Sequence, residues 1–255
     1  MNIAIVTGAS SGLGGCFVEM LDGEALDEIW VIARREQRLN ALRDKVKTPL
    51  RVMPLDLTDK AAVRSIQDEL DRQKPSVRVL INAAGYGKIG RWDDVSLEDC
   101  EGMIDLNCRA AVAVTRAALP FMTEGARIMQ ICSTAAFQPF QYLSIYAASK
   151  AFLYRYTRAL RIELIPRRIK VTAVCPYWIK DTEFIAVAKR TKDSSYIRHF
   201  PLASREKSVA KWAMRDSKLG LAVSTPGPVC MLHRLVAKFI PSEIMMWLWE
   251  LVRRI

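Results

Sequence analysis

Tyr146 and Lys150 stand four residues apart in the segment Tyr146-Ala147-Ala148-Ser149-Lys150. In a helix this spacing brings both side chains onto one face, one turn apart. A phenol with an ordinary pKa near ~10 is a poor acid or base at neutral pH, and a neighbouring ammonium favours its ionised form. The pair could therefore exchange a proton with a carbonyl or alcohol oxygen while a hydride moves at carbon. Ser133, further upstream, could hydrogen-bond that oxygen and hold it for Tyr146.

A glycine-rich loop near the start of the chain is the second feature with chemical meaning. The loop reads Thr7-Gly8-Ala9-Ser10-Ser11-Gly12-Leu13-Gly14, and a helical pattern follows it. Gly8 allows a sharp turn, whereas Gly12 and Gly14 let the backbone approach a pyrophosphate and let the helix pack closely. The N-terminus of the helix offers free N–H groups to the anion. The loop therefore predicts a dinucleotide site, although a glycine loop alone could also serve only as a turn.

Two arginines, Arg34 and Arg35, follow the second apolar run of the chain. Dinucleotide folds that take NAD usually place an acidic residue here, which holds the ribose 2′-hydroxyl. Guanidinium groups instead suit the 2′-phosphate of NADP. We therefore expect NADP(H) in preference to NAD(H), the alternative being that both arginines only begin a solvated helix.

Short apolar, β-branched runs must position these residues, and stretches of helical period separate them. The runs cover residues 3–7, 28–33, 51–55, 77–82, 126–132 and 170–175, with a seventh near 219–224. They are apolar throughout rather than alternating, as expected for parallel strands covered by helices on both faces. The order of elements predicts a Rossmann-like, doubly wound α/β fold with a parallel sheet of about seven strands.

In this order and spacing, the motifs resemble those of the short-chain dehydrogenase/reductase family over roughly residues 1–227. Asp56-Leu57 resembles the family's adenine-contacting pair, and Asn82-Ala83-Ala84-Gly85 resembles its Asn-Asn-Ala-Gly turn, with Ala83 in place of the second Asn. Asn107 matches the Asn of the family's catalytic helix. Ser133 precedes Tyr146 by the usual interval.

The resemblance implies a carbonyl/alcohol oxidoreductase with a small-molecule substrate and the catalytic set Asn107, Ser133, Tyr146 and Lys150. Lys150 would also bind the nicotinamide ribose beside Tyr146, and Asn107 would help to retain a water that links Lys150 to solvent. A homodimer or homotetramer is expected through the helices that contain Asn107 and Tyr146. The alternative is a non-catalytic dinucleotide sensor or scaffold with the same fold.

The substrate side departs from the family after the sixth run, where the chain reads Pro176-Tyr177-Trp178-Ile179-Lys180-Asp181-Thr182. Pro176, Ile179 and Thr182 are expected near the cofactor, and Tyr177 replaces a family glycine. Tyr177 and Trp178 could wall the substrate site or simply pack under the loop. Before Tyr146, the residues expected to line an apolar pocket are Phe137, Phe140, Tyr142, Leu143 and Ile145. We therefore expect a bulky hydrophobic substrate, such as a steroid or lipid.

The 255 residues suit a single domain with one large core, and we expect residues 1–255 to form it. The chain starts directly with a strand rather than a secretory leader, which predicts a cytoplasmic protein. Six scattered cysteines without CxxC pairs argue against a metal site and against disulfides. The net charge of +11 is spread along the chain without a nucleic-acid-binding motif, so a nucleic-acid partner is disfavoured.

Residues 228–255 form the least family-like part and are predicted to be an amphipathic helical tail. Ile244, Trp247, Leu248, Leu251 and Ile255 fall at helical spacing on one face. Charged residues interrupt any run long enough to span a membrane. Two interpretations stay open, namely packing on the core or a second subunit, and peripheral attachment to a membrane surface.

Overall fold

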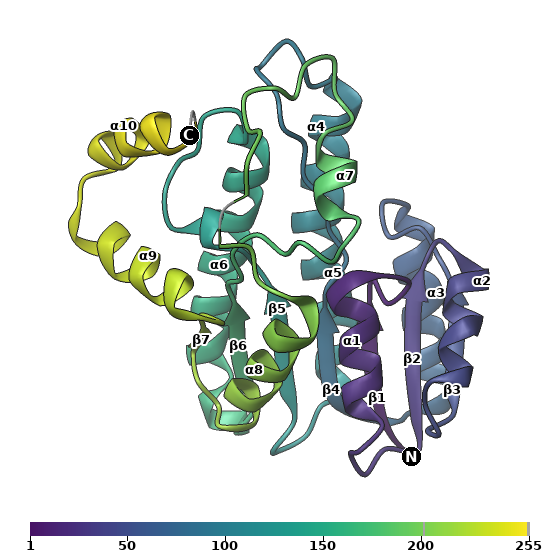
Figure 1. The fold of residues 1–255 in the computed structure, drawn as a ribbon. Coiled ribbons are helices and arrows are strands. Elements are labelled where there is room, and N and C mark those ends of the chain that lie inside the picture. Colours follow the sequence, from purple (N-terminus) through teal and green to yellow (C-terminus); the bar gives the residue numbers. More distant parts are fainter. Residues whose placement is uncertain (201, 254–255) are drawn as a thin grey trace.

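The computed structural model describes residues 1–200 and 202–253. Within these residues seven strands form one parallel sheet in the order β3-β2-β1-β4-β5-β6-β7, as Figure 1 shows. The strands are β1 (Asn2–Thr7), β2 (Glu28–Ala33), β3 (Leu50–Pro54), β4 (Ser76–Asn82), β5 (Arg127–Ile131), β6 (Lys170–Val174) and β7 (Val223–Ser224). The predicted doubly wound α/β fold is confirmed.

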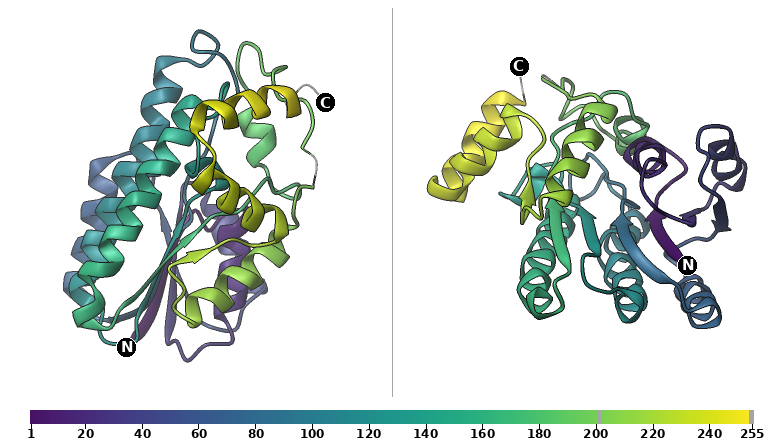
Figure 2. Two further views of the ribbon diagram at one scale, coloured as in Figure 1. Left: turned by 90° about the vertical axis from the view of Figure 1, so that its left-hand side faces the viewer. Right: turned by 90° about the horizontal axis from the view of Figure 1, so that it is seen from below.

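Helices cover both faces of the sheet (Figure 2). One layer contains α1 (Gly12–Leu21) and α8 (Glu206–Lys218), and the other contains α3 (Lys60–Gln73), α5 (Ala111–Ala118) and α6 (Ser144–Glu163). The remaining helices in the described part of the chain are α2 (Glu36–Asn40), α4 (Leu97–Ile104), α7 (Phe184–Ala188), α9 (Pro228–Phe239) and α10 (Ser242–Val252).

The strands are mostly apolar because their two faces pack against different helical layers. In β1, Ile3 and Ile5 belong to the cluster under α3, α5 and α6, whereas Ala4 and Val6 belong to the cluster under α1 and α8. Successive strand residues point to opposite faces, so a strand buried on both sides needs no polar alternation. This double burial explains why the predicted strands agree with the observed ones to within about a residue for β1 to β6.

The seventh strand is much shorter than the run that predicted it. Gly220 has a positive φ of 72°, and its N–H bonds to the carbonyl of Ser217 at the end of α8. Leu219 and Leu221 also donate backbone hydrogen bonds to the last turns of α8. Residues 219–221 thus close a helix rather than extend a strand, because the glycine adopts the left-handed conformation typical of helix ends.

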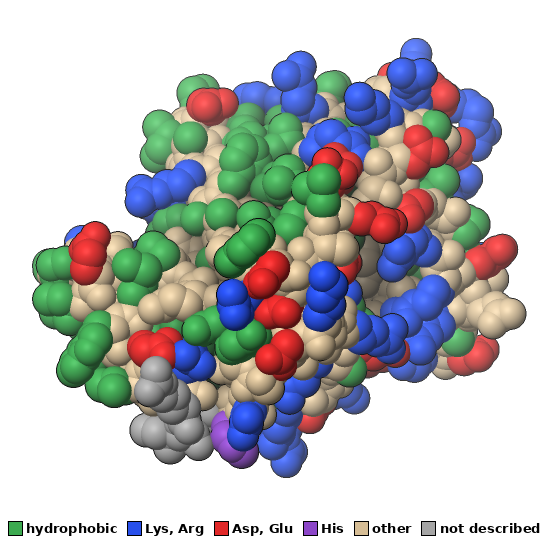
Figure 3. All heavy atoms as spheres, turned by 90° about the horizontal axis from the view of Figure 1, so that it is seen from above, with side chains coloured by type: hydrophobic (Ala, Val, Ile, Leu, Met, Phe, Trp, Pro, Cys, Tyr) green, Lys and Arg blue, Asp and Glu red, His purple; other side chains and the backbone are tan. Residues whose placement is uncertain are grey.

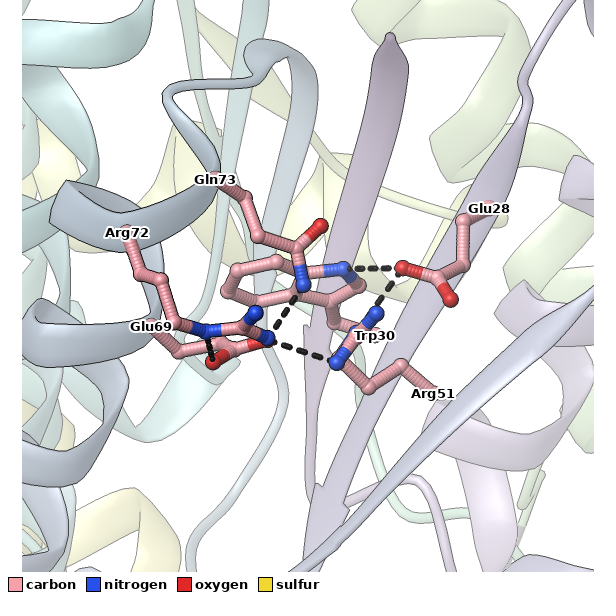
Figure 4. Close-up of polar contacts among 6 residues, drawn as sticks. All are labelled: Glu28, Trp30, Arg51, Glu69, Arg72 and Gln73. Atoms are coloured by element: carbon pink, nitrogen blue, oxygen red, sulfur yellow. Dashed lines mark hydrogen bonds and ion pairs between the residues drawn. The ribbon is translucent and has the colours of Figure 1, made fainter.

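The buried Trp30 of β2 belongs to a polar network near the β3 edge of the sheet. The Trp30 indole N–H donates to the Glu28 carboxylate at 2.7 Å, and Arg51 donates to the same carboxylate at 2.9 Å. Arg51 also donates to Glu69 of α3 at 2.6 Å, which Arg72 contacts as well (Figure 4). Because polar groups need partners when buried, this network fixes α3 against β2 and β3.

The chain reverses its direction of sheet growth between β1 and β4. From β1 the chain adds β2 and β3 on one side, and from β4 it adds β5, β6 and β7 on the other. The connections that leave β1 and β4 therefore diverge to opposite faces and open a crevice at the carboxyl ends of the strands, where such folds bind ligands.

The tail packs on the core, but through a different face from the predicted one. Met245 and Trp249 are buried, and the Trp249 ring lies 5.0 Å from Phe140. Four residues of the predicted apolar face point outward with 40–61% of their surface exposed, namely Ile244, Trp247, Leu248 and Leu251. Ile255 lies outside the described residues. Among the described residues, no helix has the length and apolarity needed to cross a bilayer.

Candidate functional site

A cavity of about 1270 Å³ opens at the carboxyl ends of the strands. Its walls come from the glycine loop, from the segments that follow β2 to β6, and from α7. Figure 3 looks onto this edge of the sheet. Lys and Arg side chains gather on the side of α2, and hydrophobic side chains gather on the opposite side, where α10 lies. The surface around the cavity therefore differs in chemistry between its two sides.

The glycine loop lines the first end, and every loop residue expected to contact a cofactor faces the cavity. Gly8 has a φ of 68°, and a Cβ there would lie 2.7 Å from the Ala84 nitrogen. A Cβ on Gly14 would lie 2.2 Å from the Gly8 carbonyl oxygen. These two positions tolerate only glycine, and α1 begins beside them at Gly12. The resulting cradle of unobstructed backbone fits a pyrophosphate.

Three arginines follow β2 at the same end. Arg34 lies 3.7 Å from the Asp56 carboxylate, and its side chain is 75% exposed. Arg35 donates to the Ser11 hydroxyl at 2.9 Å, so it bridges β2 to the glycine loop. Arg38, one turn of α2 further on, forms an ion pair with Glu183 at 2.8 Å. The site thus gathers three guanidinium groups in this part of the cavity, and such groups are strong donors to anions.

Most of the other expected cofactor residues line the cavity as well, namely Asp56, Leu57, Ala83, Ala84, Gly85, Pro176, Ile179 and Thr182. Asn82 does not. Its amide donates to the Ala111 carbonyl and to the Thr115 hydroxyl at 2.9 Å, so the side chain lies in the core between β4 and α5. The Asn82 side chain therefore does not line the cavity, since buried amide groups require partners, which α5 supplies.

Tyr146 and Lys150 both line the cavity. The Lys150 Nζ lies 5.8 Å from the centre of the Tyr146 ring, and the two residues are 5% and 7% exposed. The ammonium donates a hydrogen bond to the Ile131 carbonyl oxygen at 2.7 Å. Ser133 follows β5 two residues later and lines the same cavity. The three side chains therefore converge from α6 and from the end of β5.

Burial, rather than the ammonium, dominates the acidity of Tyr146. It raises the pKa of the phenol to about 12, and a hydrogen bond with Ser133 acts in the opposite direction. Burial also lowers the pKa of Lys150. We expected Lys150 to lower the pKa of Tyr146, but the pKa is raised instead, because the charged phenolate loses its solvation on burial. The phenol is protonated at neutral pH.

Asn107 is fully buried beside this pair, in a π-helical turn that joins α4 to α5. Its amide accepts from the Tyr86 N–H at 3.0 Å and donates to Ser149 at 2.9 Å. Gly85 separates it from Lys150, since a Cβ there would lie 2.7 Å from the Asn107 oxygen and 3.2 Å from the Lys150 nitrogen. Such bulges often mark functional positions in helices.

The far end of the cavity is mostly apolar. Its walls include Phe140, Leu143, Tyr177, Trp178 and Phe184. Tyr177 and Trp178 thus contribute to the wall rather than only packing beneath the loop.

Three of the residues expected in the apolar pocket lie elsewhere. Phe137, Tyr142 and Ile145 are not among the residues that line the cavity. Phe137 packs edge-on against Tyr154, and Tyr142 stacks on Tyr196 with a centroid distance of 4.3 Å. These rings pack against elements outside the predicted pocket, and the backbone of Tyr142 has a positive φ of 63°.

Several cavity residues escaped the sequence analysis, among them Arg38, Glu183 and Phe184. Arg38 could have been found, because a helix starting after Arg35 returns it to the same side one turn later. Glu183 and Phe184 follow the sixth strand, and only the folded chain brings Glu183 to Arg35, 148 residues away.

A model of the short chain dehydrogenase family matches residues 2–193. The NADP-dependent 3-hydroxy acid dehydrogenase YdfG of Salmonella typhimurium is 34% identical over 194 residues, which cover 75% of this chain and 78% of that protein. Sulfoacetaldehyde reductase 2 of Chromohalobacter salexigens is 36% identical over 192 residues, which cover 73% of this chain and 75% of that protein.

Solved structures agree with this likeness. A short-chain dehydrogenase from Sphingobium yanoikuyae in complex with NADPH has a TM-score of 0.78 at 25% identity, and the match covers 94% of this chain and 97% of that one. The likeness therefore extends beyond the motifs to the arrangement of nearly all elements.

The close contact between Gly14 and the Gly8 backbone leaves no room for a side chain at position 14. Gly14→Ala should lower the free energy of unfolding by about 1–3 kcal/mol, because its methyl group must push the Gly8 backbone away, and it should weaken AMP binding. Gly23→Ala is the matched control, since a Cβ there meets nothing within 4 Å. Chemical denaturation and calorimetry measure both effects. Equal stability and equal AMP affinity of the two variants would contradict this reading of the cradle.

Proposed function

The chain belongs to the short-chain dehydrogenase family, and on this premise we propose that it is an NADP(H)-dependent oxidoreductase that interconverts a carbonyl and a secondary alcohol. One observation carries the proposal. A buried, protonated phenol, an ammonium and a serine hydroxyl meet at the apolar end of a cavity, and a glycine cradle and arginines form its other end. A hydride transfer between a dinucleotide and a carbonyl carbon needs both ends.

The cofactor assignment follows from the charged end of the cavity. The glycine loop from Gly8 to Gly14 would hold the pyrophosphate, and Asp56 and Leu57 would lie at the adenine. Arg34 and Arg35 favour NADP(H) over NAD(H), because guanidinium groups bind a 2′-phosphate that a carboxylate would repel. The named cofactors of the Salmonella and Sphingobium proteins support the same preference. When bound, this cofactor supplies or accepts the hydride.

The chain's own residues handle the proton. In reduction, the Tyr146 hydroxyl gives its proton to the substrate oxygen as the carbon receives the hydride, and Ser133 holds that oxygen by a hydrogen bond. The Lys150 ammonium then stabilises the phenolate that remains. The phenolate regains a proton from solvent by way of Lys150, next to which Asn107 lies across Gly85. In oxidation the proton moves in the opposite direction.

Replacing the phenol separates an enzyme from a non-catalytic dinucleotide sensor. Tyr146→Phe should lower kcat by at least about two orders of magnitude, since it removes the proton donor. NADPH affinity, measured by fluorescence titration, should change little because the cradle is intact. Turnover that persists at the wild-type rate would exclude Tyr146 as the acid, and a wild-type chain without turnover on any carbonyl would favour the sensor.

We propose a hydrophobic substrate, such as a steroid-like or lipid-like ketone or alcohol. The apolar walls around Tyr146 support it, especially Phe140, Trp178 and Phe184. The names of two relatives point instead to a hydroxy acid and to sulfoacetaldehyde, both small and anionic. Lys88 and Arg190 also line the cavity and could meet such an anion. The short anionic substrate is therefore the second candidate.

A substrate panel decides between these candidates. With NADPH oxidation as the readout, kcat/KM should be at least about tenfold higher for bulky hydrophobic ketones, steroids included, because apolar burial contributes most of the binding free energy. Short 3-oxo acids and sulfoacetaldehyde form the comparison set. Higher kcat/KM for that set would replace the hydrophobic substrate with the anionic one.

We also propose that the protein is a cytoplasmic homodimer or homotetramer that assembles through the helices around Asn107 and Tyr146. Ile104, Phe152 and Ile162 of α4 and α6 support it, because each is at least 50% exposed and apolar surface of this kind favours association. The alternative contact is the exposed apolar face of α10, formed by Ile244, Trp247, Leu248 and Leu251. This face would meet either a second subunit or a membrane.

Light scattering tests the assembly. The native chain should have two or four times the mass of 28.8 kDa, and Phe152→Glu should lower it, whereas Trp247→Glu on α10 should not. A monomeric native chain would contradict the proposal. Loss of assembly only with Trp247→Glu would move the contact to the tail, and flotation of the native chain with anionic vesicles would assign the tail to a membrane.

A further inference from the structure

Glu183 sits where the charged end of the cavity would receive a phosphate. Its carboxylate oxygens each accept a hydrogen bond at 2.8 Å, one from Arg35 and the other from Arg38. The remaining nitrogens of Arg35 are directed to Ser10 and Ser11 of the glycine loop. A carboxylate of the chain thus occupies the guanidinium groups of Arg35 and Arg38 at the geometry that suits an anionic ligand.

Glu183 is also mechanically joined to the catalytic end of the cavity. Thr182, just before it, lies over the glycine loop, since its methyl carbon is 3.3 Å from the position of a Cβ on Gly12. Phe184, just after it, begins α7 and places its ring 5.3 Å from the Tyr146 ring. Three consecutive residues therefore reach from the arginines across the loop to the phenol.

The ion pairs are suited to exchange. Glu183, Arg35 and Arg38 have side chains that are 42–48% exposed, and pairs of this kind stabilise a fold by only about 0.2–1 kcal/mol each. Hydrogen bonds from both arginines lower the pKa of Glu183, so its negative charge is present at neutral pH. A phosphate monoester carries up to about two negative charges and three acceptor oxygens, so it competes well for the same donors.

We propose that Glu183 is an internal competitor for the cofactor's 2′-phosphate. Binding of the phosphate to Arg35 and Arg38 displaces the carboxylate and releases the segment that carries Phe184 over Tyr146. The inference rests on the proposed use of NADP(H). Through Glu183, the chain weakens its own affinity for the phosphate. Displacement of Glu183 also links occupation of the adenosine end to the opening of the substrate end.

The test compares two ligands that differ only in the 2′-phosphate, adenosine 2′,5′-bisphosphate and AMP, by calorimetry on the full chain. Glu183→Gln should bind the bisphosphate about three- to tenfold more tightly and leave AMP affinity within about twofold. Glu36→Gln is the matched control. It removes the same charge next to Arg35, yet the Glu36 side chain is exposed and forms no ion pair within the described residues.

Each outcome decides the proposal. Weaker or unchanged bisphosphate binding by Glu183→Gln would overturn it, as would equal tightening in Glu36→Gln, which indicates only long-range charge. A native chain that binds AMP but gains nothing from the 2′-phosphate would overturn it together with the NADP(H) assignment. A native chain that binds neither ligand would overturn the dinucleotide site itself.

Hydrogen exchange tests the release of the segment. In the native chain, adenosine 2′,5′-bisphosphate should accelerate amide exchange in α7 by at least about threefold relative to AMP, because the contact that holds its first turn is lost. In Glu183→Gln, exchange in α7 should already be fast without ligand. Slower exchange in α7 with the bisphosphate would overturn the proposed release.

Discussion

The structure depends on how the chain stabilises a buried ammonium. Lys150 is only 5% exposed, and an unpaired charge at such depth would cost several kcal/mol. The ammonium meets this requirement by donating to the Ile131 carbonyl at the last residue of β5. Ser133 lies two residues beyond that carbonyl, and Tyr146 lies one turn before Lys150. A single hydrogen bond between α6 and β5 thus positions all three side chains of the proposed proton-transfer site.

Burial also distinguishes the proton-transfer end of the cavity from its anion-binding end. The apolar surroundings that bury Tyr146 raise its pKa to about 12, which keeps it in the proton-donating form. At the other end, the side chains of Arg34 and Arg35 beside the glycine loop are 75% and 42% exposed. The segment from Thr182 to Phe184 touches both ends, since it contacts Gly12, Arg35 and Tyr146.

Local spacing in the sequence was enough to predict much of this arrangement. The glycine loop, the strands buried on both faces and the four-residue interval from Tyr146 to Lys150 are properties of neighbouring residues. The features that local spacing did not predict involve distant partners. The Asn82 side chain joins α5, Tyr142 stacks on Tyr196, and the apolar row of α10 faces outward because Met245 and Trp249 fit the core instead. No local pattern could have paired Glu183 with Arg35 across 148 residues.

The central claim is that burial holds Tyr146 as a neutral proton donor against the influence of Lys150. Ultraviolet titration of tyrosinate in the wild type and in Tyr146→Phe isolates the contribution of this single phenol. The account predicts identical curves between about pH 7 and about pH 10.5, because a buried phenol ionises only above that range. An ionisation with a midpoint below about pH 10, present in the wild type and missing in the variant, would contradict it.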